Sequence, residues 1–77
     1  MGNKWSKELQ ELSIDVIWNG RCMEPCRVKH WRKENSFGSV SVIQGINGDG
    51  WDVLTDNGEV EKFSTVEDLV AAGWIVD

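Results

Sequence analysis

The sequence predicts a small α+β domain, mainly β, built on an antiparallel sheet or small β-barrel of about five strands. A short N-terminal helix and a short helix before the last strand complete the expected fold. Three observations support this prediction. Short runs of alternating apolar and polar residues recur along the chain. Turn signals such as Asn19-Gly20 and Asn57-Gly58 separate these runs. The length of 77 residues, 40% of them apolar, suits one compact domain over residues 1–77.

The N-terminal third is expected to form a helix followed by a hairpin. Asn3 is a suitable N-cap, and apolar residues recur at helical spacing from Trp5 to Leu12. Residues 13–18 then alternate in polarity, which predicts a strand. The Asn19-Gly20 pair that follows is typical of a tight hairpin turn.

The remainder of the chain is expected to alternate short strands with turns and one short helix. Pro25 interrupts the return strand, because proline cannot donate a backbone hydrogen bond to a neighbouring strand. Ser64 and Glu67 match the S-x-x-E capping box of a short helix, and Gly73 is suited to end it. The strands are expected at residues 26–33, 40–46, 51–55, 60–63 and 74–76.

The run from Trp51 to Leu69 resembles the ending of SH3- and Tudor-like small barrels, in which two strands joined by a turn precede a short helix. The resemblance covers about twenty residues. It therefore implies architecture and assigns no site. Tudor domains hold methylated cations in an aromatic cage, so the resemblance also implies a cation reader as one alternative function.

Five tryptophans and no tyrosine are present. Each indole can bury roughly 150–250 Å², yet a domain of this size buries only about 60% of its unfolded surface. At least one tryptophan is therefore expected to be partly exposed. The strand patterns place Trp18, Trp51 and Trp74 in the core and Trp5 on the N-terminal helix, which leaves Trp31 as the exposed one.

Charge is distributed unevenly along the chain. Residues 1–33 carry seven basic and four acidic side chains, a balance of +3, whereas residues 34–77 carry one lysine and nine acids, a balance of −8. The protein is expected to have one basic and one acidic surface. In the alternative, the two regions face each other in the fold and partly neutralise.

A basic face around Trp31 is the first candidate partner-binding surface. In a regular strand, Arg27, Lys29, Trp31 and Lys33 share one face. A tryptophan among cations is typical of an interface hot spot or of a stacking platform for single-stranded nucleic acid. In the alternative, a bulge near Pro25 turns Trp31 inward, or its basic neighbours cover it.

An acidic edge is the second candidate partner-binding surface. Its residues come from the turns and strands of the predicted C-terminal hairpin. Such an edge could imitate the phosphates of nucleic acid and occupy a basic groove on a partner. The residues of this acidic edge are Asp49, Asp52, Asp56 and Glu59.

The sequence predicts no catalytic residue, no cofactor and no metal site, and hence no enzyme. Nucleophilic catalysis needs an oriented base, and His30 is the one histidine. Cys22, Cys26 and His30 are spaced C-x₃-C-x₃-H, which does not match the usual zinc spacing. We expect two half-buried free thiols and a reducing compartment.

Targeting signals are few. No window is long and apolar enough for a membrane span, and no secretory signal is found, so a cytoplasmic protein is expected. Residues 1–6 fit the N-myristoylation pattern with Gly2 as acceptor.

The favoured function is a small non-enzymatic protein-interaction module, such as an inhibitor or adaptor encoded by a phage or mobile element. It would bind a larger protein through the basic face or the acidic edge. The alternative is a ligand-binding small barrel that stacks a nucleotide, a modified cation or single-stranded nucleic acid. Overall acidity argues against nucleic acid as the main partner, and a homodimer stays open.

Overall fold

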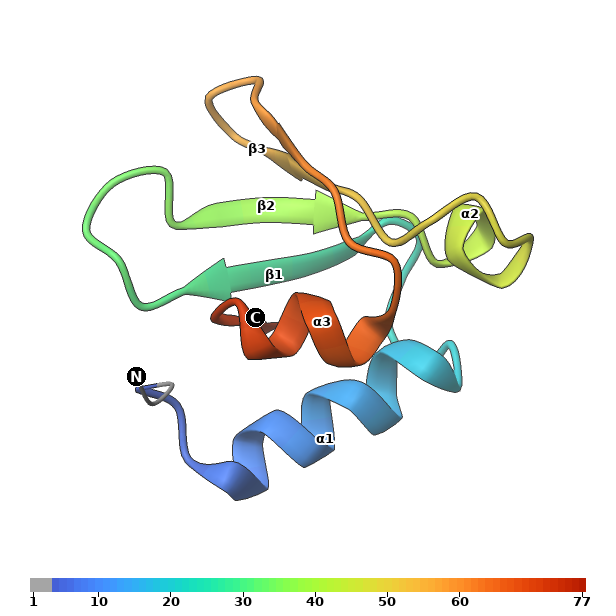
Figure 1. Cartoon of the computed structure of the whole chain (residues 1–77), viewed down its shortest axis with the longest axis horizontal. Coiled ribbons are helices and arrows are strands. Elements are labelled where there is room, and N and C mark those ends of the chain that lie inside the picture. The colour runs from blue at the N-terminus through green and yellow to red at the C-terminus, as the bar shows by residue number, and fades with distance from the viewer. Residues whose placement is uncertain (1–3) are drawn as a thin grey trace.

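Five antiparallel strands and three short helices form the structure, a computed structural model that describes residues 4–77 (Figure 1). The strands are ordered β4-β3-β2-β1-β5, so β4 and β5 are the edges of the sheet. The predicted fold class is confirmed. The elements are α1 (Lys7–Trp18), β1 (Cys26–His30), β2 (Phe37–Val40), α2 (Val42–Ile46), β3 (Val53–Thr55), β4 (Val60–Glu61), α3 (Val66–Ala71) and β5 (Trp74–Val76).

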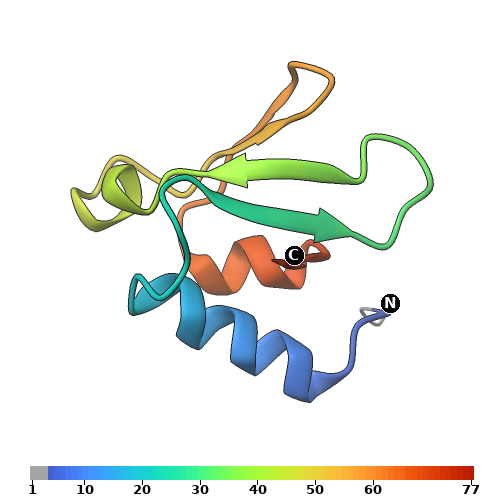
Figure 2. The same ribbon diagram turned by 180° about the vertical axis from the view of Figure 1, so that it is seen from behind.

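Alternate residues of the central strands form one side of the core. Val28, Val40 and Val53 are completely buried, because every second side chain of a strand points to the same face. Val40 lies directly opposite Val53 in the β2–β3 pair. Helices α1 and α3 pack against each other on one side of the β1–β2 hairpin, as Figures 1 and 2 both show. The other buried apolar residues are Ile17, Cys26, Val42, Trp51, Val66, Leu69, Val70, Trp74 and Ile75.

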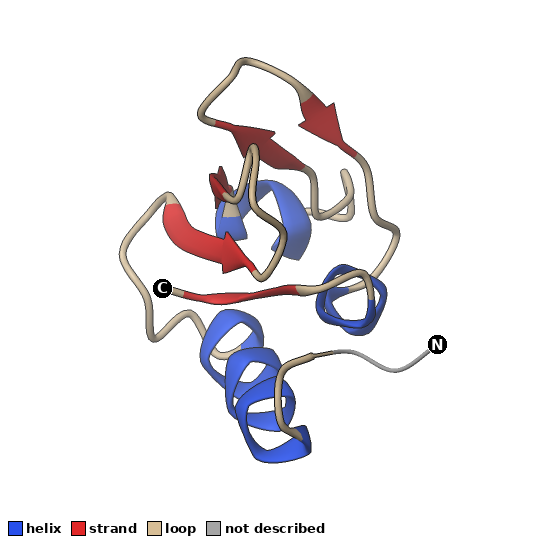
Figure 3. Ribbon diagram, turned by 90° about the vertical axis from the view of Figure 1, so that its left-hand side faces the viewer, coloured by secondary structure: helices blue, strands red, loops and turns tan. Residues whose placement is uncertain are grey.

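Helix α1 covers the free edge of strand β5, beneath which it lies in Figure 3. The buried hydroxyl of Ser13 accepts a hydrogen bond from the backbone N–H of Val76 at 3.1 Å. Near the N-terminal end of α1, the indole Nε1 of Trp5 donates to the carbonyl oxygen of Gly73 at 2.7 Å. Unpaired strand edges promote aggregation, so these contacts both anchor the helix and protect the edge.

Trp74 joins the two edges of the sheet through side chains that we call the Trp74 cluster: Trp74, Glu61, Arg32 and His30. The indole is 0% exposed, and its Nε1 donates to Glu61 Oε1 on β4 at 3.0 Å. Arg32 donates to Glu61 Oε2 at 2.6 Å, and its Cζ lies 4.8 Å from the Trp74 ring centroid. The His30 ring meets Trp74 edge-on at 5.2 Å. Burial alone would raise the pKa of Glu61, but the hydrogen bonds from Arg32 and Trp74 outweigh it and lower that pKa.

The predicted strand over residues 13–18 is wrong, because α1 continues through Trp18. Ser6 caps this helix and accepts a hydrogen bond from the backbone N–H of Leu9; the Asn3 cap lies outside the described residues. Ser13 and Ile17, four residues apart, face the interior, so the helical period prevails over the alternation. The Asn19-Gly20 pair ends the helix instead of turning a hairpin.

One further predicted strand is shorter in the structure, because β1 ends at His30 instead of residue 33. The predicted strand over residues 40–46 is wrong, because β2 runs from Phe37 to Val40 and residues 42–46 are helical. The segment after β2 is helix α2, because Ser41 caps it and the carboxylate of Glu24 accepts a hydrogen bond from the backbone N–H of Val42 at 2.9 Å.

The C-terminal predictions hold with small shifts. The Asn57-Gly58 turn joins β3 and β4, and Gly58 has φ of +87°. Thr65, one residue after the predicted Ser64, caps α3 by accepting from the backbone N–H of Asp68 at 3.0 Å. Gly73 follows the helix with φ of +113°, as its predicted role requires.

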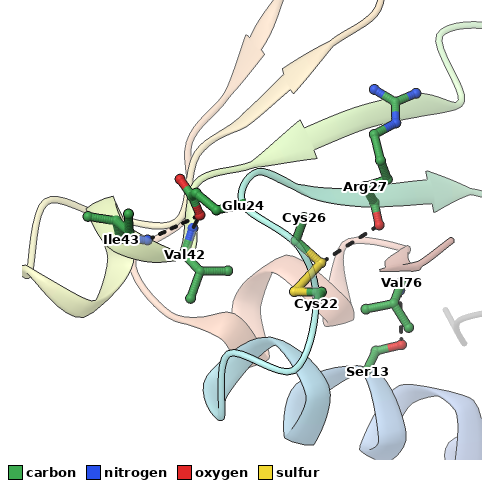
Figure 4. The surroundings of a disulfide bond; sticks show 8 residues. All are labelled: Ser13, Cys22, Glu24, Cys26, Arg27, Val42, Ile43 and Val76. Carbon is green, nitrogen blue, oxygen red and sulfur yellow. Dashed lines mark hydrogen bonds between the residues drawn. A yellow bond between two sulfur atoms is a disulfide. The ribbon is translucent and has the colours of Figure 1, made fainter.

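Cys22 and Cys26 form a disulfide that ties the segment after α1 to the start of β1 (Figure 4). The Cα atoms are 5.4 Å apart, and the Glu24–Pro25 peptide bond inside the loop is cis. Glu24 lies in this loop and points to the N-terminus of α2. The expected free thiols are therefore wrong. A disulfide is rare in reducing compartments, so it does not favour the expected cytoplasmic location.

Replacing Glu61 with glutamine should weaken the fold. Each carboxylate oxygen of Glu61 accepts one donor, from Trp74 or from Arg32. The side-chain amide of glutamine has only one acceptor oxygen, so its NH₂ group would lie against the N–H donor of either Trp74 or Arg32. We expect Glu61→Gln to lower the free energy of unfolding by about 1–3 kcal/mol in urea titrations. The matched control, Glu59→Gln on the exposed turn before β4, should stay within about 0.5 kcal/mol of wild type. Equal losses in both variants would contradict this role of Glu61.

Acidification should destabilise the fold through His30. Its Nε2 donates to the carbonyl of Ala72 at 2.7 Å, and its Nδ1 accepts the backbone N–H of Arg32 at 3.0 Å. Burial lowers the pKa of His30, and Arg32 acts in the same direction; the bond to Ala72 and the charge of Glu61 oppose this shift without cancelling it. In the folded protein His30 therefore takes up a proton only at a lower pH than in the unfolded chain, where the ordinary His pKa is about 6.5.

The free energy of unfolding should therefore be highest above about pH 7 and should fall as the pH drops through the unfolded His pKa of about 6.5 towards the lower folded pKa. Carboxylates with lowered pKa lose their contribution only at more acidic pH, below their unfolded pKa of about 4. Urea unfolding across this range, compared with His30→Gln, measures the effect. The variant should show a flatter profile; a wild-type stability that rises on acidification would disprove the prediction.

Candidate functional site

The strand alternation that predicted the basic face does not extend over all four of its residues. Arg27 and Lys29 lie on β1, whereas Trp31 and Lys33 lie in the loop after it, so their part in partner binding stays a prediction. Trp31 is 38% exposed; Lys4 Nζ lies 5.0 Å from its ring centroid and the His30 ring lies beside it at 4.7 Å. Lys4 and the His30 ring thus already cover part of this indole.

The predicted basic face and acidic edge meet at one pair. Arg27 donates to both carboxylate oxygens of Asp56, each at 3.0 Å, and also to the hydroxyl of Ser39 at 2.9 Å. The hydrogen bond from Arg27 lowers the pKa of Asp56, and the same bond raises the pKa of Arg27. At this pair the two charged regions neutralise each other, as the alternative interpretation of the charge distribution expected.

Other members of the acidic edge also have partners within the chain. Asp52 accepts a hydrogen bond from Gln44 Nε2 at 3.2 Å, and Glu59 accepts one from Asn35 Nδ2 at 2.7 Å. Asp49 is exposed in the loop after α2. The structure therefore does not present these four carboxylates as one free edge, and their part in partner binding stays a prediction.

A cleft of about 440 Å³ lies between α1 and the start of α3, with Trp18 and Trp51 in its wall. Sites for small ligands commonly measure about 300–1,000 Å³. The walls of the cleft come from three parts of the chain: α1, the segment from α2 to the residue pair before β3, and the start of α3 with the two residues before it. The lining residues that bear on its chemistry are Glu11, Asp15, Trp18, Gly45, Trp51 and Glu67.

The two indoles of the cleft differ in exposure. Trp51 is only 3% exposed and its ring packs on Gly45, where an added Cβ would overlap the ring. Because Gly45 has no Cβ, the Trp51 indole can pack directly on its backbone. Trp18 is 62% exposed, and its ring centroid lies 5.8 Å from that of Trp51 with 40° between the planes. The prediction that Trp18 belongs to the core is wrong, whereas Trp51 and Trp74 are buried as predicted.

Three carboxylates surround the cleft. Glu11 and Asp15 come from α1, and Glu67 comes from the first turn of α3. Asp15 binds Arg21 at 3.2 Å and Asn19 at 2.7 Å. Across residues 4–77, no side chain forms an ion pair or hydrogen bond with Glu11 or Glu67. None of the described lining residues is basic, so the cleft carries negative charge beside an open indole.

The sequence prediction missed this site for two reasons. Glu11, Asp15 and Trp18 are spaced i, i+4 and i+7, which places them on one face of a helix. Assigning residues 13–18 to a strand separated Glu11 from the other two. The third carboxylate, Glu67, lies on α3, and no local signal in the sequence places that helix beside α1.

Some kinds of site are absent from the described part of the chain. No group of three or more His, Cys, Asp or Glu side chains within residues 4–77 is arranged to hold a metal ion. The three described helices are all too short or too polar to cross a bilayer. The Gly2 acceptor of the myristoylation pattern lies outside the described residues.

Comparison with known proteins adds no relative to these observations. No family model matches the sequence, and neither a curated protein nor a solved structure is detectably similar.

Proposed function

We propose that this protein is a small interaction module that binds a cationic side chain of a larger protein in the Trp18–Trp51 cleft. The observation that carries the proposal is the 62% exposed indole of Trp18 beside a set of carboxylates, with no basic residue among the described lining residues. The face of an indole attracts a cation. The carboxylates of Glu11 and Glu67 add ionic attraction.

The exposure of Trp18 itself supports a partner surface. A tryptophan in contact with water keeps much of its apolar area unburied, and Trp is enriched among residues that dominate the energy of interfaces. A partner that covered this ring would recover that burial. The position of Trp18 at the last turn of α1 makes it accessible without unfolding any element.

Trp31 is the weaker candidate on the same criteria. It is less exposed than Trp18, and Lys4 and His30 already contact its ring. A cationic partner would have to displace Lys4. The expected class of function, a non-enzymatic module with a protein partner, is therefore proposed here with a different surface, and such a module would act as an inhibitor or adaptor.

Phosphate-bearing ligands suit the cleft poorly. Nucleotides and single-stranded nucleic acid stack on aromatic rings, but their phosphates need nearby cations. The described lining residues offer carboxylates instead. Of the expected alternative ligands, only a cation fits this charge.

Substitution of the two exposed tryptophans separates the surfaces. We expect Trp18→Ala to weaken binding of a fluorescently labelled basic peptide, Gly-Arg-Gly-Lys-Gly-Arg-Gly, by roughly three- to tenfold in anisotropy titrations, because cation–π contacts contribute about 0.5–2 kcal/mol. The urea midpoint of Trp18→Ala should change little, since the ring is mostly exposed. Trp31→Ala is the matched control and should bind as wild type does. A loss confined to Trp31→Ala, or no binding by wild type, would refute the proposed site.

A further inference from the structure

We infer that the cleft selects an arginine side chain over lysine or a quaternary ammonium. The inference rests on the proposed function and names the cation that a partner would present. Three observations support it: one open indole in the cleft, two carboxylates there without partners among residues 4–77, and the way in which the chain binds Arg32 elsewhere.

The cleft is not an enclosed aromatic cage. Trp51 is 3% exposed, so Trp18 supplies the one widely open ring face, and no other aromatic residue is among the described lining residues. A quaternary ammonium has no N–H to donate, and its recognition depends on several rings that surround it. With a single open face, the cleft lacks what such a ligand needs.

Two carboxylates in the cleft offer negative charge and hydrogen-bond acceptors in place of further aromatic rings. Glu11 on α1 and Glu67 on α3 approach the cleft from two sides. A guanidinium group is planar, carries five N–H donors, and can stack on an aromatic face while it donates to carboxylates from its edge. An ammonium group is compact and more strongly hydrated, so it gains less from the same surroundings.

The chain already binds one guanidinium group, that of Arg32, in this manner. Arg32 stacks on Trp74 with its Cζ 4.8 Å from the ring centroid while it donates to Glu61. Lys4, by contrast, lies over Trp31 at 5.0 Å, and no carboxylate of residues 4–77 forms an ion pair with it. In the Trp74 cluster, the cation that lies beside both an indole and a carboxylate is an arginine.

The rim of the cleft also accepts a guanidinium from the chain itself. Arg21 donates to Asp15 Oδ2 at 3.2 Å, and both side chains remain largely exposed. Glu11 and Glu67 are left for an external ligand. The site therefore fits an arginine in an accessible segment of a partner protein, approaching from the Trp18 side.

Four matched peptides test this selectivity on the whole protein. Acetylated and amidated Gly-Ser-X-Ser-Gly peptides, with X as arginine, lysine, trimethyl-lysine or citrulline, are titrated by calorimetry. We expect arginine to bind at least several-fold more tightly than lysine and trimethyl-lysine, and citrulline, which lacks the charge, to bind least. Glu67→Gln should weaken arginine binding several-fold, whereas Asp68→Asn, one residue further along α3 and outside the cleft, should not.

The outcomes separate the two proposals. If trimethyl-lysine or lysine binds as well as arginine, the arginine inference fails and the proposed cation site stands. If citrulline binds as well as arginine, charge is not recognised and both fail. If none of the peptides binds, the proposed function fails as well. Equal losses in Glu67→Gln and Asp68→Asn would show a nonspecific charge effect and overturn the role of Glu67.

Discussion

The indole of Trp74 connects parts of the chain that the backbone of the sheet leaves apart. Strands β4 and β5 are the two edges of the sheet, and the hydrogen bond between Trp74 and Glu61 joins them. Arg32, in the loop after β1, donates to the same Glu61 carboxylate. His30, at the end of β1, packs against the Trp74 ring. A domain of 77 residues has little apolar area to spare. One fully buried indole with a satisfied N–H therefore contributes both packing and specificity.

The position of the Trp74 cluster also explains the distribution of the other tryptophans. Trp5 is fixed by its bond to Gly73, next to Trp74, and Trp31 lies beside His30, so both belong to the end of the molecule where α1 begins. Helix α1 then carries the chain over its twelve residues to Trp18. There Trp51 already fills the space above Gly45, which leaves Trp18 outside the core and beside the carboxylates of α1 and α3.

Local signals were sufficient to predict the fold from about residue 51 to the end of β5. The Asn57-Gly58 turn, the short helix and the last strand depend on neighbouring residues, and all are present. The prediction for residues 13–18 was wrong because the segment fits both a strand and a helix. The hydrogen bond from Val76 to Ser13 decides between the two. Helix α2 was not predicted because its N-terminus is capped partly by Glu24, which lies eighteen residues before Val42 in the sequence. The candidate site depends on the same long-range contacts, so it could not be assembled from sequence spacing alone.

The five indole N–H signals in a ¹⁵N-labelled NMR spectrum, followed during titration with the arginine peptide, test the account most directly. Each signal can be assigned by a single Trp→Phe substitution. The account predicts that the Trp18 signal shifts most and that of Trp51 shifts less. The signals of Trp5 and Trp74, whose N–H groups are bonded within the fold, should stay in place, and so should that of Trp31. A shift centred on Trp31, with Trp18 unchanged, would contradict the central claim that the Trp18–Trp51 cleft is the binding surface.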